Sequence, residues 1–531
     1  MAIRKTPKTA AKTAAKAVAA SLAAAGVAAA SLAWASAPAN AAPADTLVDT
    51  GLGALQGTTD GAVRSWLGVP YAAPPEGDLR WESPQPADPW EGVREADGFG
   101  PACAQGVASM PAVPGEEEDC LYLNVYAPDT GRDDLPVMVW FHGGGNSYGA
   151  GSQYDPSQLV EEGRAVVVTV NYRQGLFGSM SHPALDEGGA TTSGNYGLED
   201  QQAAMRWVRE NAAAFGGDDG NVTIFGESGG GYDVCAHLTS PSSAGLFDKA
   251  VIQSAPCGTA WAPTRAEGQA RDIAVAEQLC PDDEALADIE ACLRELEPSE
   301  LNAATSGLYE VQPVDGGPVM PVATADAISA GQVADVPVLI GINRAEEQLM
   351  TGGQEVLTGQ PITEADYADT LEATFGPDAA AVAAEYPVGE YENPAKALAA
   401  VQTDLHWAAP LSVTAAGIGA HTDAFVYELA ATDTPWFTIF DRPTWRSDSY
   451  HMVDVAYLFE PDFYEARTAR QEAVADAMVK AWTTFARTGD PDGRGRWTEG
   501  ECAARAFTDE GVRRTDFADV HHLEFWEDLN A

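Results

Sequence analysis

The sequence predicts an α/β protein with a large, mostly parallel central sheet flanked by helices. Short apolar runs rich in β-branched residues alternate with segments whose apolar residues recur at helical spacing. The apolar runs are nearly continuous, which is typical of strands that are covered on both faces. No Pro/Ser-rich linker separates these segments, so we expect a single domain over residues 42–531.

The predicted elements follow one another along the chain. Strands are expected at these apolar runs: 136–141, 165–171, 222–225, 250–254, 336–341 and 424–429. The helix expected at 197–215 has an apolar face made of Ala204, Trp207, Val208 and Ala212. A helix near the C-terminus has a similar face, made of Val474, Met478, Trp482 and Phe485, and stops before Gly489 and Pro491.

Residues 1–41 are predicted to be a secretory signal peptide. Basic residues between positions 4 and 16 precede an alanine-rich apolar stretch at 17–34, and Ala39-Asn40-Ala41 offers a small-residue cleavage site. The alternative is a retained membrane anchor, but the stretch ends in a cleavage motif and lacks a stop-transfer signal. We therefore expect an exported, soluble chain that starts near Ala42 and has no stable membrane association.

The composition is strongly acidic. There are 79 acidic and 30 basic residues, and the formal net charge is -49. Such a surface repels nucleic acid and anionic membranes, so neither is expected as a partner. Charge indicates nothing about the fold, and the oligomeric state stays open.

The seven cysteines favour disulfides, because an exported chain meets an oxidising environment. Two pairs would join loops, the second of them around a short acidic helix: Cys103–Cys120 and Cys280–Cys292. Cys235 and Cys257 could form a third pair, which would leave Cys502 without a partner. No C-x-x-C or H-E-x-x-H motif is present, so we expect neither a metal site nor a catalytic cysteine.

A glycine-rich stretch around Ser228 follows the strand expected at 222–225. It is either an ordinary turn or a nucleophile elbow, in which flanking glycines let the backbone present a serine hydroxyl above the sheet. The strand before it and the helix expected at 230–238 favour the elbow, because catalytic groups gather at the C-terminal ends of parallel strands. Ser228 is therefore the candidate nucleophile.

A serine nucleophile needs a base and an acid that orients the base. Behind a nucleophile elbow, the acid and then the histidine follow in the chain. His451 comes after a polar turn and leads into an apolar segment, and His406 is its rival. His237 is too close to the elbow in sequence, and His521 and His522 are interpreted as solvated residues of a charged tail.

Motifs spread over the chain carry a family resemblance. They are GVPYAAPPEGDLRW (68–81), EDCLYLNVYAP (118–128), FHGGG (141–145), GNYGLEDQQAAMRWV (194–208) and VTIFGESGGG (222–231), and the match extends to AWTTFARTGDP (481–491). Together they resemble the type B carboxylesterase family, whose relatives include para-nitrobenzyl esterases, cholinesterases and the larger fungal lipases. The resemblance implies an α/β-hydrolase fold over nearly all of the mature chain.

The resemblance also implies a catalytic triad. The nucleophile falls on Ser228, and Glu346 occupies the acid position of a motif that usually reads Gly-x-Asn-x-Asp-Glu-Gly. The family's His-x-x-Asp/Glu-x-x-Tyr-x-Phe pattern begins at His451, which makes this residue the base in place of His406. One departure is Glu347, where the family has glycine: a second carboxylate could compete for His451 or point to solvent.

The oxyanion hole that the resemblance implies consists of backbone N–H groups of Gly144, Gly145 and Gly229. Relatives often have alanine in place of Gly229, but glycine keeps the N–H group. The residues expected around the site are Asn146, which could line an acyl pocket, Glu227, and Ser254, which could support the histidine or simply fill the core.

The predicted function is that of a secreted serine hydrolase, which cleaves small carboxylic esters through an acyl-enzyme and needs no metal or organic cofactor. One alternative is a lipase acting at lipid–water interfaces, although the sequence shows no clear hydrophobic lid. Another is a non-catalytic binding or adhesion module on the same fold. Such modules commonly lose the nucleophile or its partners, whereas this chain retains them.

Overall fold

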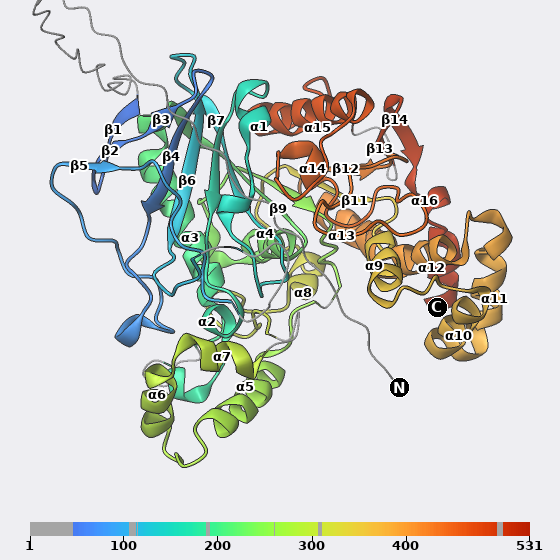
Figure 1. Ribbon diagram of the computed structural model, residues 1–531, viewed down its shortest axis with the longest axis horizontal. Helices are drawn as coiled ribbons and strands as arrows, with labels where there is room; N and C mark the ends of the chain where they lie inside the picture. Colours follow the sequence, from blue (N-terminus) through green and yellow to red (C-terminus); the bar gives the residue numbers. More distant parts are fainter. Residues whose placement is uncertain are drawn as a thin grey trace, which may run out of the picture. The chain divides into compact units, whose positions relative to one another are not determined.

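A large twisted sheet forms the centre of the molecule (Figure 1). The computed structural model describes residues 46–105, 113, 115–186, 192–259, 261–305, 311–495, 497 and 503–530. They belong to one compact unit, Ala42–Ala531. The predicted signal peptide and Cys502 lie outside the described residues.

The 11-stranded sheet has the order β14-β13-β12-β11-β10-β9-β7-β8-β6-β4-β3. Its central strands are parallel: β8 (Val166–Val170), β7 (Leu135–Phe141), β9 (Gly217–Glu227), β10 (Lys249–Gln253), β11 (Val338–Asn343), β12 (Ala424–Leu429) and β13 (Ala503–Thr508). All the predicted strands are among them, which confirms the predicted fold class.

The antiparallel strands at the two ends of the sheet were not predicted. They are β3 (Thr58–Thr59), β4 (Val63–Pro70) and β6 (Tyr122–Pro128) at one end, and β14 (Gly511–Asp516) at the other. A separate small sheet contains β1 (Leu47–Thr50), β2 (Gly53–Gln56) and β5 (Val93–Glu95). Partly polar strands such as β14 lack the continuous apolar run that marks a strand buried on both faces.

Each face of the sheet packs against its own set of helices. In β7, Val137, Val139 and Phe141 join one hydrophobic cluster, whereas Met138 and Trp140 join another. The first cluster includes residues of α3 (Tyr196–Asn211) and α4 (Gly229–Thr239). The second includes residues of α1 (Ser157–Glu161), α14 (Val455–Leu458) and α15 (Ala469–Thr488). Side chains that alternate between the two faces of a strand therefore bury both faces.

Further helices complete the fold (Figure 1), and some of them also contribute residues to the first cluster, such as Ile328, Leu411 and Phe517. They are α2 (Gly175–Ser179), α5 (Arg265–Leu279), α6 (Leu286–Glu295), α7 (Pro298–Ala304), α8 (Thr324–Ser329), α9 (Gln348–Thr358), α10 (Glu364–Phe375), α11 (Ala379–Glu385), α12 (Pro394–Thr403), α13 (Ala409–Gly419), α16 (Phe517–Val520) and α17 (Leu523–Asn530). A π-helical turn at Asp404–Ala408 joins α12 to α13. No helix in the described part of the chain combines the length and apolarity that a bilayer crossing needs.

The two helices predicted from their apolar faces are present. Helix α15 starts after Thr468, whose side chain accepts a hydrogen bond from the Gln471 N–H, and it ends at Gly489, which has a left-handed φ of 77°. Helix α3 is shorter than predicted, because the last part of the segment 197–215 forms a separate 3₁₀ turn, Ala212–Phe215.

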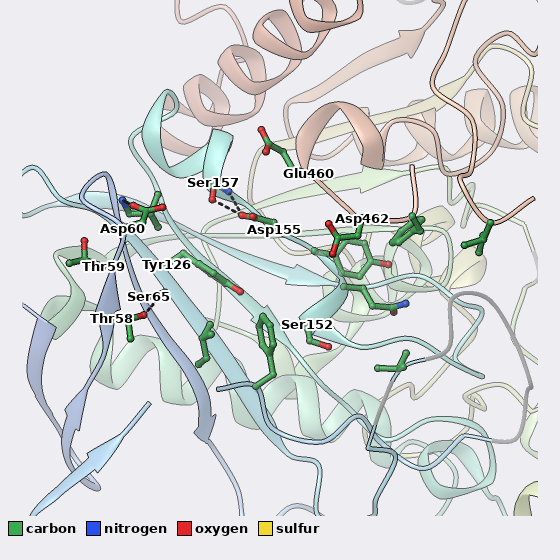
Figure 2. Close-up of a pocket in the computed structure, with 18 residues that line it drawn as sticks. Thr58, Thr59, Asp60, Ser65, Tyr126, Ser152, Asp155, Ser157, Glu460 and Asp462 are labelled. Carbon is green, nitrogen blue, oxygen red and sulfur yellow. Dashed lines mark hydrogen bonds between the residues drawn. The ribbon is translucent and has the colours of Figure 1, made fainter. Parts of the chain in front are cut away.

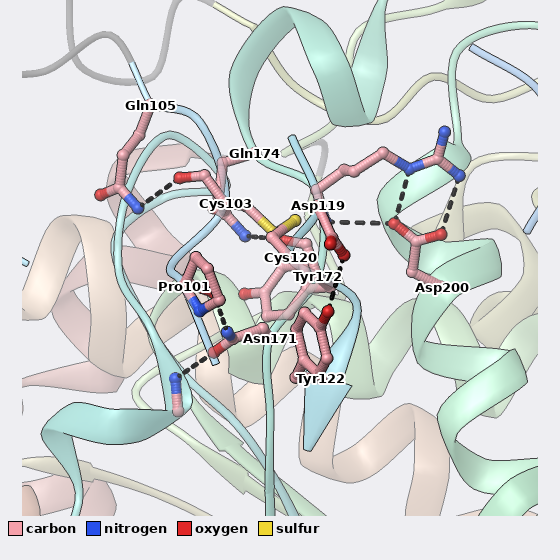
Figure 3. The surroundings of a disulfide bond; sticks show 12 residues. Pro101, Cys103, Gln105, Asp119, Cys120, Tyr122, Asn171, Tyr172, Gln174 and Asp200 are labelled. Atoms are coloured by element: carbon pink, nitrogen blue, oxygen red, sulfur yellow. Dashed lines mark hydrogen bonds and ion pairs between the residues drawn. A yellow bond between two sulfur atoms is a disulfide. The ribbon is translucent and has the colours of Figure 1, made fainter. Parts of the chain in front are cut away.

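The three predicted disulfides are present: Cys103–Cys120, Cys235–Cys257 and Cys280–Cys292. Cys292 lies within α6 rather than beyond it. Gln105, close to the first disulfide, donates to the Gly149 carbonyl and accepts from the Gly149 N–H, both at 3.0 Å. This disulfide therefore closes a loop that is hydrogen-bonded to the segment after β7. Figure 3 shows the surroundings of the disulfide.

The interpretation of His521 as a solvated tail residue is wrong. Its side chain is only 2% exposed and lies between the carboxylates of Asp404 and Glu428, the second at 2.8 Å from Nε2. Burial lowers the pKa of His521, but its hydrogen bonds to both carboxylates outweigh burial and raise it to about 9. His522 is half-buried and its Nδ1 lies 2.6 Å from Glu385.

We expect His521→Gln to lower the free energy of unfolding by about 3 kcal/mol near pH 6, because two buried carboxylates lose their shared cation. A histidine whose pKa is raised on folding stabilises fully below its unfolded value of about 6.5, and this contribution is lost as the pH rises through about 9. Urea unfolding of the wild type and the variant at about pH 6 and about pH 10 should show a difference in the free energy of unfolding that shrinks at the higher pH. An equal difference at both pH values would contradict a stabilising charge on His521 between Asp404 and Glu428. The exposed His421→Gln variant is the control.

Candidate active site

Ser228 occupies a sharp turn between β9 and α4. Its backbone has φ 54° and ψ -121°, which non-glycine residues rarely adopt. The turn is held because the Ser228 N–H donates to the Gln253 carbonyl on β10 at 2.9 Å, and the Tyr232 N–H donates to the Ser228 carbonyl at 3.0 Å. Such strain persists only where the surroundings impose it, which is typical of a functional turn.

Glycine is needed beside this turn for close packing. A Cβ atom on Gly230 would lie 2.0 Å from the Phe141 carbonyl oxygen at the end of β7, and one on Gly226 would lie 2.4 Å from the Gly230 carbonyl oxygen. The glycines of the motif therefore let α4 start directly against the sheet, and this holds Ser228 at the C-terminal edge of the parallel strands.

Three residues far apart in the sequence meet at this edge. His451 Nε2 lies 3.0 Å from Ser228 Oγ, and His451 Nδ1 lies 2.7 Å from Glu346 Oε2. All three are buried: Ser228 is 7% exposed, His451 4% and Glu346 0%. The structure thus joins the three residues predicted from the motifs into one hydrogen-bonded chain. The rival His406 has a side chain that is 54% exposed.

The Glu346 carboxylate is fixed from several sides. Its Oε1 accepts hydrogen bonds from the Ser254 hydroxyl at 2.6 Å and from the Asn343 N–H at 2.7 Å. The His451 N–H also donates to the Glu346 carbonyl at 3.0 Å. Ser254, predicted either to support the histidine or to fill the core, thus donates to the acid, and it can support His451 only through Glu346.

Glu227 is a second carboxylate at the imidazole. Its Oε1 lies 3.4 Å from His451 Nε2 and has no hydrogen-bond partner among the described residues, although the side chain is 1% exposed. Asp454, which sequence reasoning treated only as part of a motif, lies in the same buried cluster and accepts from Gln253 and Asn343. Burial raises the pKa of Glu227 well above its usual value.

These carboxylates set the electrostatics of His451. Burial lowers the pKa of the imidazole, but the carboxylates of Glu227 and Glu346 outweigh burial and raise it to about 9. The Glu227 carboxylate raises the pKa of His451, whereas the charged imidazole lowers the pKa of Glu227, so the two groups titrate as a coupled pair. The cluster is therefore built to stabilise a positive charge on the imidazole.

The glycine loop after β7 approaches the turn closely. A Cβ atom on Gly229 would lie 2.7 Å from Gly145 N, and one on Gly143 would lie 3.4 Å from Ser228 Cβ. Gly144 and Gly145 have φ values of 109° and 59°, in the region that favours glycine. The three predicted oxyanion-hole residues thus lie on two segments that touch each other beside Ser228.

Asn146 directs its side chain away from solvent and into the core. It is 4% exposed, and its Nδ2 donates to Asp233 Oδ1 at 3.1 Å. Asp233, which sequence reasoning missed, also accepts from Gln201 Nε2 at 2.7 Å, and burial raises its pKa to about 7. Asn146 therefore ties the glycine loop to α4, and this contact differs from the acyl-pocket role that the sequence suggested.

Glu347 neither binds His451 nor points to solvent. Its Oε1 accepts from Trp407 Nε1 at 2.8 Å, and its side chain is 14% exposed. The Trp407 ring lies against the His451 ring, with centroids 4.7 Å apart. No signal in the sequence identifies Trp407, because this contact depends on the π-helical turn that carries it.

Neither a cavity beside the sheet nor a cysteine-containing cluster adds a residue to this site. A cavity of about 740 Å³ lies beside β4 and β6 (Figure 2), but none of the three candidate catalytic residues lines it. In the described part of the chain, the one group with metal-ligand spacing contains Cys280, Asp283 and Cys292, whose two sulfur atoms are joined in a disulfide. That group therefore offers no thiolate pair for a metal.

The strand order, the strained serine turn after β9 and the histidine–carboxylate pair at the same sheet edge define an α/β-hydrolase. The chain belongs to the carboxylesterase family: a sequence model described as "Carboxylesterase family" matches residues 44–511. This confirms the resemblance found in the motifs. The protein is a carboxylic ester hydrolase, as are the relatives it matches.

Several characterised relatives are similar over most of the chain. The para-nitrobenzyl esterase of Bacillus subtilis (strain 168) is 32% identical over 464 residues, which cover 84% of this chain and 90% of that protein. The cocaine esterase of Oryctolagus cuniculus is 34% identical over 466 residues, covering 82% and 85%. The fumonisin B1 esterase of Sphingopyxis macrogoltabida is 38% identical over 351 residues, covering 63% and 62%.

Solved structures are similar in fold as well. A structure named PNB esterase is 31% identical, with a TM-score of 0.73, and the match covers 91% of this chain and 100% of that chain. A thermophilic PNB esterase is 30% identical, with a TM-score of 0.74 and coverage of 90% and 99%. The α/β-hydrolase fold expected from the sequence is thus present over most of the chain.

Proposed function

We propose that this protein is a secreted serine carboxylesterase in which Ser228 is the nucleophile, His451 the base and Glu346 the orienting acid. The observation that carries the proposal is the buried chain of hydrogen bonds from Glu346 through His451 to Ser228 Oγ. A serine hydroxyl becomes a strong nucleophile when a base accepts its proton and a third group orients that base.

The reaction begins when His451 Nε2 takes the proton of Ser228 Oγ, which attacks the ester carbonyl carbon. The resulting oxyanion accepts hydrogen bonds from the N–H groups of Gly144, Gly145 and Gly229. His451 then gives its proton to the leaving alcohol, and an acyl-enzyme on Ser228 remains. Water, deprotonated by His451, attacks this ester, releases the carboxylic acid and regenerates the serine.

The surrounding carboxylates favour the charged intermediate. His451 becomes positive in each tetrahedral step, and Glu346 and Glu227 lie 2.7 Å and 3.4 Å from its two nitrogens. Because they are buried, they act in a medium of low dielectric and need no rearrangement as the charge develops. The same carboxylates raise the resting pKa of His451, so we expect the reaction to be faster on the alkaline side of neutrality.

Small, soluble esters are the substrates that we propose. The names of the relatives refer to compounds of different kinds, namely para-nitrobenzyl esters, cocaine and fumonisin B1. A lipase is less well supported, because an acidic surface discourages binding at anionic interfaces. A non-catalytic binding module would not need the intact hydrogen-bonded chain at Ser228.

Secretion is supported by the three disulfides, since such bonds persist in oxidising compartments. The proposed signal peptide at residues 1–41 would direct the export. We propose that the mature chain starts near Ala42, binds no nucleic acid and has no stable membrane association.

The test is hydrolysis of para-nitrophenyl esters, from acetyl to palmitoyl, by protein collected from the culture medium, with and without detergent micelles. We expect the highest kcat/KM for short acyl chains, no activation by micelles, and an N-terminal sequence that starts near Ala42. A burst of para-nitrophenol equal to the enzyme concentration should precede the steady state if the acyl-enzyme accumulates. Activation by micelles with a preference for palmitoyl esters would instead establish a lipase.

A further inference from the structure

Trp407 covers one face of the proposed base. Its ring centroid lies 4.7 Å from that of His451, with an angle of 39° between the two planes. The hydrogen bonds to Glu346 and Ser228 hold His451 at its two ring nitrogens, along the edge of the ring. Bonds in the plane of the ring fix its nitrogens but restrict tilting about the line that joins them only weakly, so contact with a ring face adds a separate constraint.

The Glu347 carboxylate holds the indole of Trp407. Glu347 Oε1 accepts the Trp407 Nε1–H at 2.8 Å, and the Glu347 N–H donates to Thr403 Oγ1 at 3.1 Å. Burial raises the pKa of Glu347, but the neighbouring His406 and the Trp407 N–H outweigh burial and lower it, so Glu347 carries its negative charge at neutral pH. A hydrogen bond to an ionised acceptor is stronger than one between neutral groups.

Trp407 reaches His451 because the chain widens locally into a π-helical turn. The turn spans Asp404–Ala408, and π-helical turns are frequent at functional sites. Its first residue, Asp404, is held by the Tyr386 hydroxyl at 2.7 Å and by the buried His521. The segment that carries Trp407 is thus fixed at Asp404 as well as by Glu347, and the indole cannot move freely.

We propose that Trp407 is a positioning residue for His451 and that Glu347 holds the indole in the orientation that this role requires. This inference rests on the proposed function, in which His451 is the base. The adjacent carboxylates of Glu346 and Glu347 then serve the same imidazole in two ways. Glu346 binds its edge directly, and Glu347 acts on its face through the indole.

The physical effect of the indole is twofold. It keeps the imidazole aligned with Ser228 Oγ, where a small displacement costs much of the rate. Its π face also attracts a cation within about 6 Å, so it favours the imidazolium that forms in the tetrahedral steps over the neutral ring. At an alkaline pH, where His451 is neutral before the reaction, both effects act more strongly in the transition state than in the ground state and therefore affect kcat.

The test compares kcat and KM for para-nitrophenyl acetate among variants of Trp407 and Glu347. We expect Trp407→Ala to lower kcat by roughly 10- to 100-fold with little change in KM. Trp407→Phe and Glu347→Leu should each lower kcat by about 5-fold, because each removes the same hydrogen bond. Their combination should cost no more than the larger single loss. Glu347→Gln, whose amide oxygen can still accept the indole N–H, should stay within about 2-fold of the wild type.

The chain offers a matched control. Trp445 Nε1 donates to Glu355 Oε2 at 2.9 Å in a separate hydrophobic cluster, so Trp445→Phe removes the same kind of bond away from His451. It should leave kcat unchanged, and equal melting temperatures for the two Trp→Phe variants would separate positioning from a loss of stability.

Several results would overturn the proposal. They are a wild-type kcat in Trp407→Ala, an effect on KM alone, additive losses in the double variant, or a Glu347→Gln variant as slow as Glu347→Leu. A wild-type enzyme no faster than Ser228→Ala would overturn the proposed function and this inference together. An active wild type with unchanged kcat in Trp407→Ala would overturn the positioning role alone.

Discussion

Replacing Ser228 with alanine is expected to lower kcat for para-nitrophenyl acetate by about 10⁵- to 10⁶-fold and to leave the fold intact. The variant removes the atom that would form the acyl-enzyme, and neither His451 nor the glycine loop can replace it. Alanine keeps a Cβ atom, so the strained backbone at φ 54° is no less favourable than with serine. Steady-state and burst kinetics, together with the melting temperature, measure this result.

A matched serine variant shows whether the loss is specific. The hydroxyl of Ser412 donates to the Ala409 carbonyl within α13, far in the sequence from the proposed triad, and Ser412→Ala should hydrolyse esters at the wild-type rate. A Ser228→Ala enzyme that kept a stoichiometric burst would contradict the assignment of the nucleophile. Loss of the melting transition would indicate that the variant had failed to fold.

The second large effect is expected from Gly229→Ala, which should lower kcat by about 100-fold with little change in KM. Although relatives often have alanine here, we expect this effect because in this chain the glycine loop lies too close for a Cβ atom. Gly229 has an ordinary backbone conformation at the start of α4, so alanine causes no torsional strain there. Its Cβ atom would instead lie 2.7 Å from Gly145 N and 2.9 Å from Gly145 Cα. The glycine loop must therefore move, and oxyanion donors work only within a narrow range of distances.

The control for this variant is Gly353→Ala. Gly353 lies within α9, and a Cβ atom there would meet no other atom within 4 Å. Alanine favours a helix over glycine by up to about 1 kcal/mol, so the control should be slightly more stable and fully active. Full activity of Gly229→Ala would show that the loop tolerates the displacement or that Gly145 does not bind the oxyanion.

The central strands could be predicted because their sequences carry a strong local signal. Strand β12, Ala424–Leu429, has the predicted bounds, and β7 differs by one residue. The missed strands of the sheet, β13 among them, lie toward its two ends, and polar residues such as Arg64 in β4, Asn124 in β6 and Arg505 in β13 interrupt their apolar runs. A strand without a continuous apolar run was missed even where it is buried, as β6 is.

The site was predictable to the extent that it depends on motifs. Ser228 lies in a glycine turn after an apolar strand, and this local pattern has a local physical cause. The choice between His451 and His406 needed a family pattern, since both lie in plausible segments of the chain. No spacing rule marks contacts between segments far apart in sequence. The roles of Trp407 and Asp233 and the ion pairs of His521 depend on such contacts.

By itself, the sequence determined the fold class, most of the parallel strands at the centre of the sheet and the turn at Ser228, and it suggested the three cysteine pairs. Each of these follows from local composition, short spacing or a motif. Only the tertiary structure decided that Glu347 binds an indole, that Asn146 faces Asp233 and that His521 is buried between two carboxylates. The free energy of a buried polar group depends on the partners that surround it, and distant segments supply those partners only when the chain has folded.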